Sequence, residues 1–179
     1  MSIKLKKSED IKQIAFCSMM IALSLALMFI SSIFCYSTFL VAFAGGLLSY
    51  ITALETKLTR AFCAYLIIVM LSMFFIARKS AVIDYTLFCG FYPIIELKIS
   101  KLNSFLTKLL IKLMIFFTCS YVTLNLNFFI AGISNVHAPK LKFTAYLIFS
   151  MSCLCFDYFL QEFKLFYNKK IKNKILRHF

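Results

Sequence analysis

The sequence predicts an all-α integral membrane protein: a bundle of six transmembrane helices with both termini cytoplasmic and the fourth helix kinked near Pro93. Hydrophobic residues make up 62% of the 179 residues and the mean hydropathy is +0.88, whereas about 45–50% of a soluble domain is apolar. These residues fall in runs long enough to cross a hydrocarbon core of about 30 Å. The 4 glycines and 2 prolines are too few for an all-β chain rich in turns.

The first three spans are expected at roughly 13–34, 36–54 and 61–77. No charge occurs from Ile14 to Phe34, and this run is too long for the apolar region of a cleaved signal peptide, so we expect a retained span. The second run stops at Glu55 and follows the first so closely that the two should form a tight helical hairpin. The third run, bounded by Arg60 and Arg78, is at the short end of the usual range for a span.

The fourth span, 81–96, is the most ambiguous run by its length. Gly90 and Pro93 lower its helix propensity, but membrane helices tolerate proline because neighbouring groups satisfy the carbonyl that loses its partner. Pro93 has no N–H for the carbonyl of Cys89, so we expect a kink at that point.

The last two spans are expected at 111–133 and 143–161, followed by a basic cytoplasmic tail, 162–179, that lies against anionic lipid. With six spans, 16 of the 20 basic residues fall on the side of the termini and 4 on the other side. This bias fits the positive-inside rule, whereas five spans would put the two terminal basic clusters on opposite sides. Nothing indicates a second domain, so 1–179 is interpreted as one transmembrane domain.

The composition also bears on function classes. The net charge of +13 is explained by the cytoplasmic flanks, so we expect no nucleic-acid partner. The cysteines lie inside apolar runs without a CxxC pair, which argues against a metal site. HExxH, GxSxG and Gly-rich phosphate-loop motifs are absent from the sequence, so we expect neither an enzyme nor a bound cofactor, and active transport would need a partner ATPase.

Two acidic residues lie within the apolar runs, where ionisable groups are costly and often functional. Asp84 is near the outer end of the fourth span, and two readings stay open: contact with a ligand, or a structural partner such as Arg78 or Lys79. Asp157 is near the inner end of the sixth span. For Asp157 we favour a structural role, with Lys164 and the inner lysines as partners.

Polar and aromatic residues gather near the outer ends of spans four and five, with Tyr92 also on span four. They could line an outward-facing pocket with aromatic walls and a few polar anchors, or they could be ordinary interfacial aromatic and cap residues. The candidate substrate-binding residues are Asp84, Tyr85, Asn125, Asn127, Asn135 and His137.

The first span carries small residues at every fourth position, namely Ser18, Ala22 and Ala26. Such a row makes a flat helix face for close packing, either within the same bundle or against a partner membrane protein. A pore would instead need polar residues along a whole helix, and no run has that pattern.

The small size, the six spans, the cytoplasmic termini, the Ala22–Ala26 face and the missing ATPase together resemble the S component of energy-coupling factor (ECF) transporters. In that family an alanine-x-x-x-alanine pattern on the first helix docks on a coupling subunit driven by two ATPases. Ala22 and Ala26 match it and Ser18 extends the row. The resemblance implies capture of a small molecule from outside. The alternative is a non-enzymatic integral membrane scaffold or assembly protein of the cell envelope.

Two stretches, ARKSAVIDYTLFCGFYPIIELKISKL and LCFDYFLQEF, also resemble a set of uncharacterised small six-span membrane proteins of low-GC Gram-positive bacteria. The shared parts are an F-x-G-F/Y-Y-P element followed by a charged exit, and a Y/F-D element late in the last span. Both resemblances imply a multi-pass protein of the bacterial cytoplasmic membrane.

Overall fold

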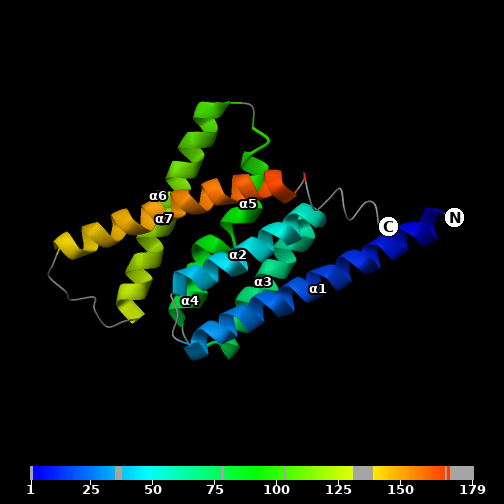
Figure 1. Cartoon of the computed structure of the whole chain (residues 1–179), viewed down its shortest axis with the longest axis horizontal. Helices are drawn as coiled ribbons and strands as arrows, with labels where there is room; N and C mark the ends of the chain where they lie inside the picture. Colours follow the sequence, from blue (N-terminus) through cyan, green and yellow to red (C-terminus); the bar gives the residue numbers. More distant parts are fainter. Residues whose placement is uncertain are drawn as a thin grey trace.

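The computed structural model describes residues 2–34, 38–77, 79–102, 104–130, 139–167 and 169. Over these ranges the protein is helical throughout and contains no β-strand (Figure 1). The elements in chain order are α1 (Ser2–Phe34), α2 (Thr38–Glu55), α3 (Leu58–Phe75), α4 (Lys79–Asp84), the π-helical turn η1 (Tyr85–Cys89), α5 (Tyr92–Ile99), α6 (Phe105–Ile130) and α7 (Pro139–Phe166). The all-α fold class predicted from the sequence is confirmed.

Within the described residues, five segments are long and apolar enough to cross a membrane, which supports a multi-pass membrane protein. They are Asp10–Ile30, Leu58–Phe75, Lys79–Ile99, Phe105–Ile130 and Phe143–Phe166. The remaining apolar helix, Phe39–Glu55 in α2, is shorter. The sequence pointed to the fourth run as the ambiguous one, but the structure continues that run as helix to Ile99. The short element is α2.

The fourth segment is not a continuous α-helix. Its backbone widens into the π-helical turn η1, and the Gly90 N–H donates to the Tyr85 carbonyl at 2.7 Å, five residues back. Pro93 then stands in the first turn of α5, where a missing N–H costs no helical bond. The irregular backbone therefore precedes Pro93, and the proline begins the next helix.

The segment Lys79–Ile99 is the centre of the molecule: 61% of its apolar window is buried, against 17% for Phe105–Ile130 and for Phe143–Phe166. It packs on α2 at two adjacent glycines. A Cβ placed on Gly46 would lie 2.2 Å from the carbonyl oxygen of Cys89, so the two backbones meet directly. This is the carbonyl that Pro93 cannot bond.

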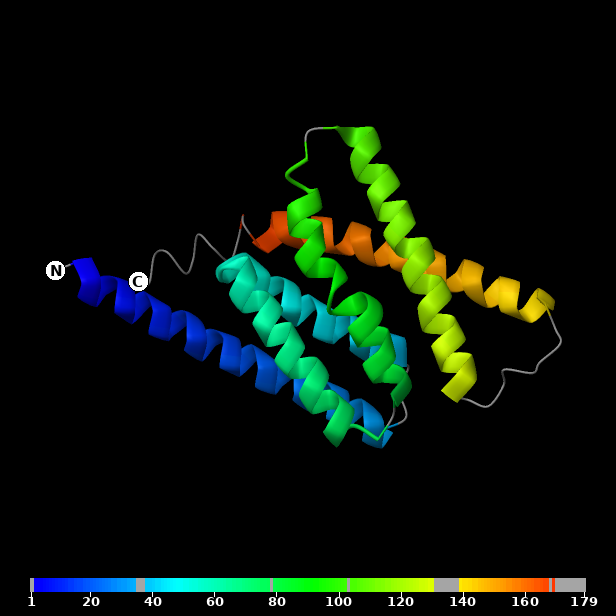
Figure 2. The ribbon, with the colours of Figure 1, turned by 180° about the vertical axis from the view of Figure 1, so that it is seen from behind.

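Aromatic side chains join the remaining helices to this centre. The rings of Phe88 and Tyr92 stack with centroids 5.2 Å apart, and Phe116 of α6 lies 5.1 Å from Tyr92. Phe156 of α7 packs between Phe88 and Phe43, at 5.7 and 4.2 Å. Figures 1 and 2 show the C-terminal end of α7 beside α5 and α1 beside α3. These aromatic contacts hold α5, α6 and α7 close together.

Candidate functional site

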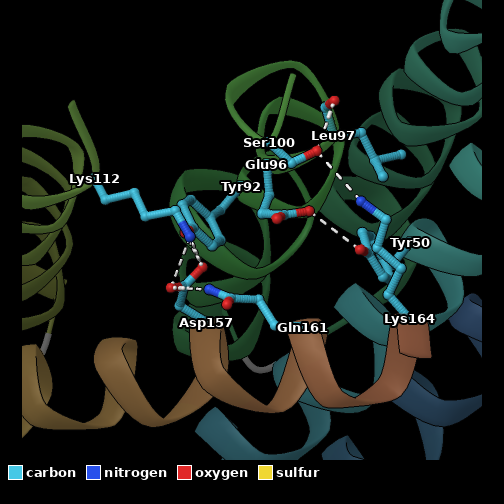
Figure 3. A network of polar contacts seen from close by, with 9 residues as sticks. All are labelled: Tyr50, Tyr92, Glu96, Leu97, Ser100, Lys112, Asp157, Gln161 and Lys164. Carbon is cyan, nitrogen blue, oxygen red and sulfur yellow. Dashed lines mark hydrogen bonds and ion pairs between the residues drawn. The ribbon is translucent and has the colours of Figure 1, made fainter. Parts of the chain in front are cut away.

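The first polar centre lies where α5, α6 and α7 meet, and we call it the inner polar centre (Figure 3). Asp157 of α7 accepts hydrogen bonds from Lys112 Nζ at 2.7 and 2.8 Å, from Gln161 at 2.9 Å, and from the hydroxyl of Tyr92. The side chains of Lys112 and Asp157 are 15% and 12% exposed. A buried ion pair is tolerated when further hydrogen bonds satisfy both charges, and Asp157 meets that condition.

A second carboxylate, Glu96, lies beside this pair and is only 2% exposed. It accepts a hydrogen bond from the hydroxyl of Tyr50 at 3.1 Å. One turn later, Ser100 accepts from two lysines: Lys164 Nζ lies 3.3 Å from its hydroxyl oxygen and Lys108 Nζ lies 3.1 Å from its carbonyl oxygen. Five charged side chains therefore gather at this end of the bundle.

These groups surround a cavity of about 500 Å³. Its polar lining is Glu96, Ser100, Lys108, Lys112, Asp157, Gln161 and Lys164, and its apolar lining is Phe105, Leu109 and Leu165. Three lysines face two carboxylates there, so the cavity carries an excess of positive charge. This charge suits it to anions rather than to metal ions. The described residues contain no group of three His, Cys, Asp or Glu side chains that could hold a metal ion.

Part of this centre was predicted from the sequence. A structural role was favoured for Asp157, with Lys164 and the inner lysines as partners, and Lys112 is one of those lysines. The bonds from Gln161 and Tyr92 were not predicted, and Lys164 donates to Ser100 instead. Glu96 is the last residue of the fourth predicted span and was not among the candidate residues. Its spacing was the available signal, because a residue four positions after Tyr92 lies on the same helix face.

The second polar centre lies between α4 and α6, and we call it the outer polar centre. Asp84, 5% exposed, accepts a hydrogen bond from Asn127 Nδ2 at 2.9 Å. Within the described part of the chain, the carbonyl oxygen of Asn127 is buried without a hydrogen-bond partner, and so is the hydroxyl of Thr123, one turn earlier on α6. Since buried polar groups are nearly always paired, these two atoms mark a place where a ligand could bind. Thr123 was not among the residues selected from the sequence.

Two other candidate substrate-binding residues within the described ranges, Tyr85 and Asn125, form their hydrogen bonds elsewhere. Tyr85 is fully buried, and its hydroxyl bonds Ser49 at 2.7 Å on the side of α2. Asn125 is exposed, accepts from the Tyr146 hydroxyl at 3.2 Å and donates to a backbone carbonyl of its own helix. Asn135 and His137 lie outside the described residues, as does Arg78.

Lys79, the other basic partner considered for Asp84, turns away from it. Its ammonium group donates to the carbonyl oxygens of Met73 and Ile76, at 2.5 and 3.0 Å, at the end of α3. Among the four candidates that the structure describes, it brings Asp84 and Asn127 together.

The candidate docking row on α1 faces outward. Ser18, Ala22 and Ala26 are all exposed, while the opposite face buries residues such as Met20 and Met28 against α2 and α3. Packing within this bundle therefore does not explain the row. No family model, curated protein or solved structure matches this chain.

Proposed function

We propose that this protein is the membrane-embedded substrate-binding subunit of an ECF-type uptake transporter, with six spans and both termini cytoplasmic. In this proposal it captures a small molecule from outside at the outer polar centre and docks on a coupling subunit through the exposed row of α1. The energy comes from partner ATPases.

The observation that carries the proposal is a pair of buried polar atoms on α6 that have no hydrogen-bond partner among the described residues, one of them on Asn127, which bonds Asp84. Leaving a buried donor or acceptor unpaired costs about 1–3 kcal/mol, and the Asn127 carbonyl oxygen and the Thr123 hydroxyl are both in that state. A solute that supplies an N–H or O–H donor to Asn127 and an acceptor to Thr123 removes this cost. The substrate class is therefore a small polar molecule that carries both kinds of group.

Native mass spectrometry of protein purified gently from its own host membrane tests the binding role. We expect a small molecule bound to the wild type and lost from Asn127→Leu. Asn125→Leu is the matched control, because Asn125 is on the same helix but exposed, and it should keep the molecule. A wild type with no bound molecule contradicts the binding role.

The docking role has its own test. Ala22→Trp should abolish co-purification with a coupling subunit and ATPases, because the bulky ring prevents close helix approach. Leu23→Trp is the control, since Leu23 is exposed on α1 but lies outside the row. Unchanged co-purification of Ala22→Trp contradicts docking through this face.

A non-enzymatic envelope scaffold is the second candidate, and the position of Tyr85 favours it. The Tyr85 ring fills the space beside Gly45 and Gly90, so one of the expected pocket walls is a core residue instead. Purification with envelope-assembly proteins and without a small molecule supports the scaffold.

A further inference from the structure

The cavity at the inner polar centre holds two lysines whose ammonium groups form no ion pair with a carboxylate of the described residues. Lys108 and Lys164 both donate to Ser100, one to its carbonyl oxygen and the other to its hydroxyl oxygen, and both acceptors are neutral. Across the described ranges of the chain neither lysine forms an ion pair with a carboxylate. Two ammonium groups held at one residue repel each other, and an anion placed between them removes that repulsion.

We propose that this cavity binds a phosphate-bearing anion through Lys108 and Lys164. Neither carboxylate of the cavity is bonded to these two lysines, because Asp157 is paired with Lys112 and Glu96 accepts from the neutral hydroxyl of Tyr50. Three lysines against two carboxylates leave one positive charge in excess in the cavity. Lysine ammonium groups bind phosphate as compact point charges. The Ser100 hydroxyl, between the two lysines, adds a further polar contact for a phosphate oxygen.

The surroundings fit the headgroup region of a lipid. Lys108 is in the first turn of α6 and Lys164 in the last turn of α7, so the charges lie at helix ends. The apolar side chains that line the same cavity, Phe105, Leu109 and Leu165, are exposed. Basic pockets between helix ends with apolar neighbours suit phospholipids, whose phosphate binds the lysines while the chains lie along the apolar residues. A free phosphate ester offers the same anion without the chains.

The test uses the full-length protein in nanodiscs of phosphatidylcholine and phosphatidylglycerol at equal moles. Native mass spectrometry then counts the phosphatidylglycerol molecules that stay bound to the protein after it is released from the nanodisc. We expect retained phosphatidylglycerol on the wild type and affinity about 30-fold weaker in Lys108→Gln/Lys164→Gln, because each lysine near anionic lipid contributes about fivefold.

The matched control is Lys98→Gln/Lys101→Gln. Both of these lysines are exposed and lie near the same end of the bundle. The double substitution removes the same total charge as Lys108→Gln/Lys164→Gln. We expect this variant to stay within about threefold of the wild type, because exposed charges are screened by salt. An equal loss in both double variants shows only diffuse surface charge and overturns the proposal.

A second arm separates the two sources of phosphate. Glycerol phosphate is titrated calorimetrically into the protein in nanodiscs of phosphatidylcholine alone. Lysine-dependent binding of glycerol phosphate identifies a free ester as the ligand, whereas lysine-dependent retention of phosphatidylglycerol alone identifies a lipid. Binding of neither anion to the wild type overturns the proposal.

Two further variants keep the test decisive if the double glutamine variant does not fold. Lys164→Gln alone, at the helix end, should weaken binding about fivefold. Lys108→Arg/Lys164→Arg keeps both charges and should retain the anion. Wild-type binding by Lys164→Gln, with unchanged elution from a sizing column, contradicts a role for Lys164.

Discussion

At the scale of single residues, Asp157 shows how this bundle tolerates a buried charge. Its donors come from three helices: Tyr92 on α5, Lys112 on α6 and Gln161 on α7. An isolated carboxylate in an apolar surrounding is strongly unfavourable, and each donor lowers that cost. The same bonds hold the three helices together, so Asp157 acts as the polar junction of the inner polar centre.

Removing one partner of this junction should destabilise the protein more than removing both. Lys112→Met leaves the Asp157 carboxylate buried without its cation, and we expect a loss of about 3–5 kcal/mol in the free energy of unfolding. Lys112→Met/Asp157→Asn should lose less, because no charge stays buried. Titration of SDS into detergent-solubilised protein measures both values. Lys101→Met, at an exposed lysine, is the control, and an equal loss there contradicts the junction.

The Tyr50 hydroxyl provides a milder test at the same scale. Tyr50→Phe removes the donor to Glu96, and leaving that buried acceptor without its partner should cost about 1–3 kcal/mol. Tyr158→Phe changes an exposed tyrosine on α7 and should be neutral. The same SDS titration compares the two variants, and equal stability of Tyr50→Phe and the wild type contradicts the role of this bond.

Individual side chains are where the sequence predicted least. Asp84 and Asp157 stand out because acids are rare in apolar runs. Asn127 was selected for the same pocket as Asp84, and Lys112 was one of the inner lysines expected near Asp157. Their individual bonds were not predicted, since these partners are 43 and 45 positions away and only tertiary packing joins them. Tyr92 and Asp157 belong to the two short elements, FCGFYP and FDYF, that were selected separately in the sequence, and the structure joins them by a hydrogen bond.

At the scale of elements, the contact between α2 and η1 determines how the fourth segment is held. Gly46 lets the Cys89 carbonyl approach the α2 backbone, and Pro93 leaves that carbonyl without its helical donor. The two glycines of α2 differ in what they face. A Cβ on Gly45 would meet the edge of the Tyr85 ring at 3.2 Å, a side chain that can shift slightly, whereas Gly46 faces fixed backbone.

We therefore expect Gly46→Ala to be far more damaging than Gly45→Ala. A methyl group forced to 2.2 Å from the Cys89 oxygen must push α2 away from η1, and overpacking of this kind costs about 1–3 kcal/mol or more. Gly45→Ala is the matched control on the same helix. Thermal melting in detergent, followed by the monodisperse fraction on a sizing column, compares the two. Equal melting temperatures for Gly46→Ala and the wild type contradict the direct backbone contact.

Hydropathy and charge predicted the existence and order of the helices well, because run length in an apolar sequence reports span length. The interior of the fourth segment was less predictable. Pro93 predicted a kink where the Cys89 carbonyl loses its helical donor, and the structure has a π-helical turn that ends at Cys89. The π-helical form, with the Gly90 N–H bonded to the Tyr85 carbonyl, was not predicted. The backbone form at this point depends on the packing of Cys89 against Gly46 of α2, which is a contact between segments far apart in the sequence.

At the scale of the whole molecule, the outer faces of α6 and α7 are strongly apolar. Large side chains such as Phe117, Phe129, Ile148 and Met151 are more than half exposed. A soluble protein rarely shows such continuous apolar surface, so these faces are suited to lipid or to a partner membrane protein. The three carboxylates of the two polar centres, Asp84, Glu96 and Asp157, are by contrast buried inside the bundle, as expected for ionisable groups in a membrane protein.

The orientation of the chain in the membrane is a prediction from charge, and topology reporters test it. Alkaline phosphatase is active only outside the cytoplasm, so fusions after Lys57, after Lys101 and at the C-terminus should be inactive, and a fusion after Ile76 should be active. The reason is the excess of basic residues on the side of the termini. Green fluorescent protein at the same positions is the reciprocal control and should fluoresce where the phosphatase is silent. An active phosphatase after Lys101 contradicts the six-span arrangement. It would also move Lys108 and Lys164 to the outer surface, and their anion would then come from the outer leaflet.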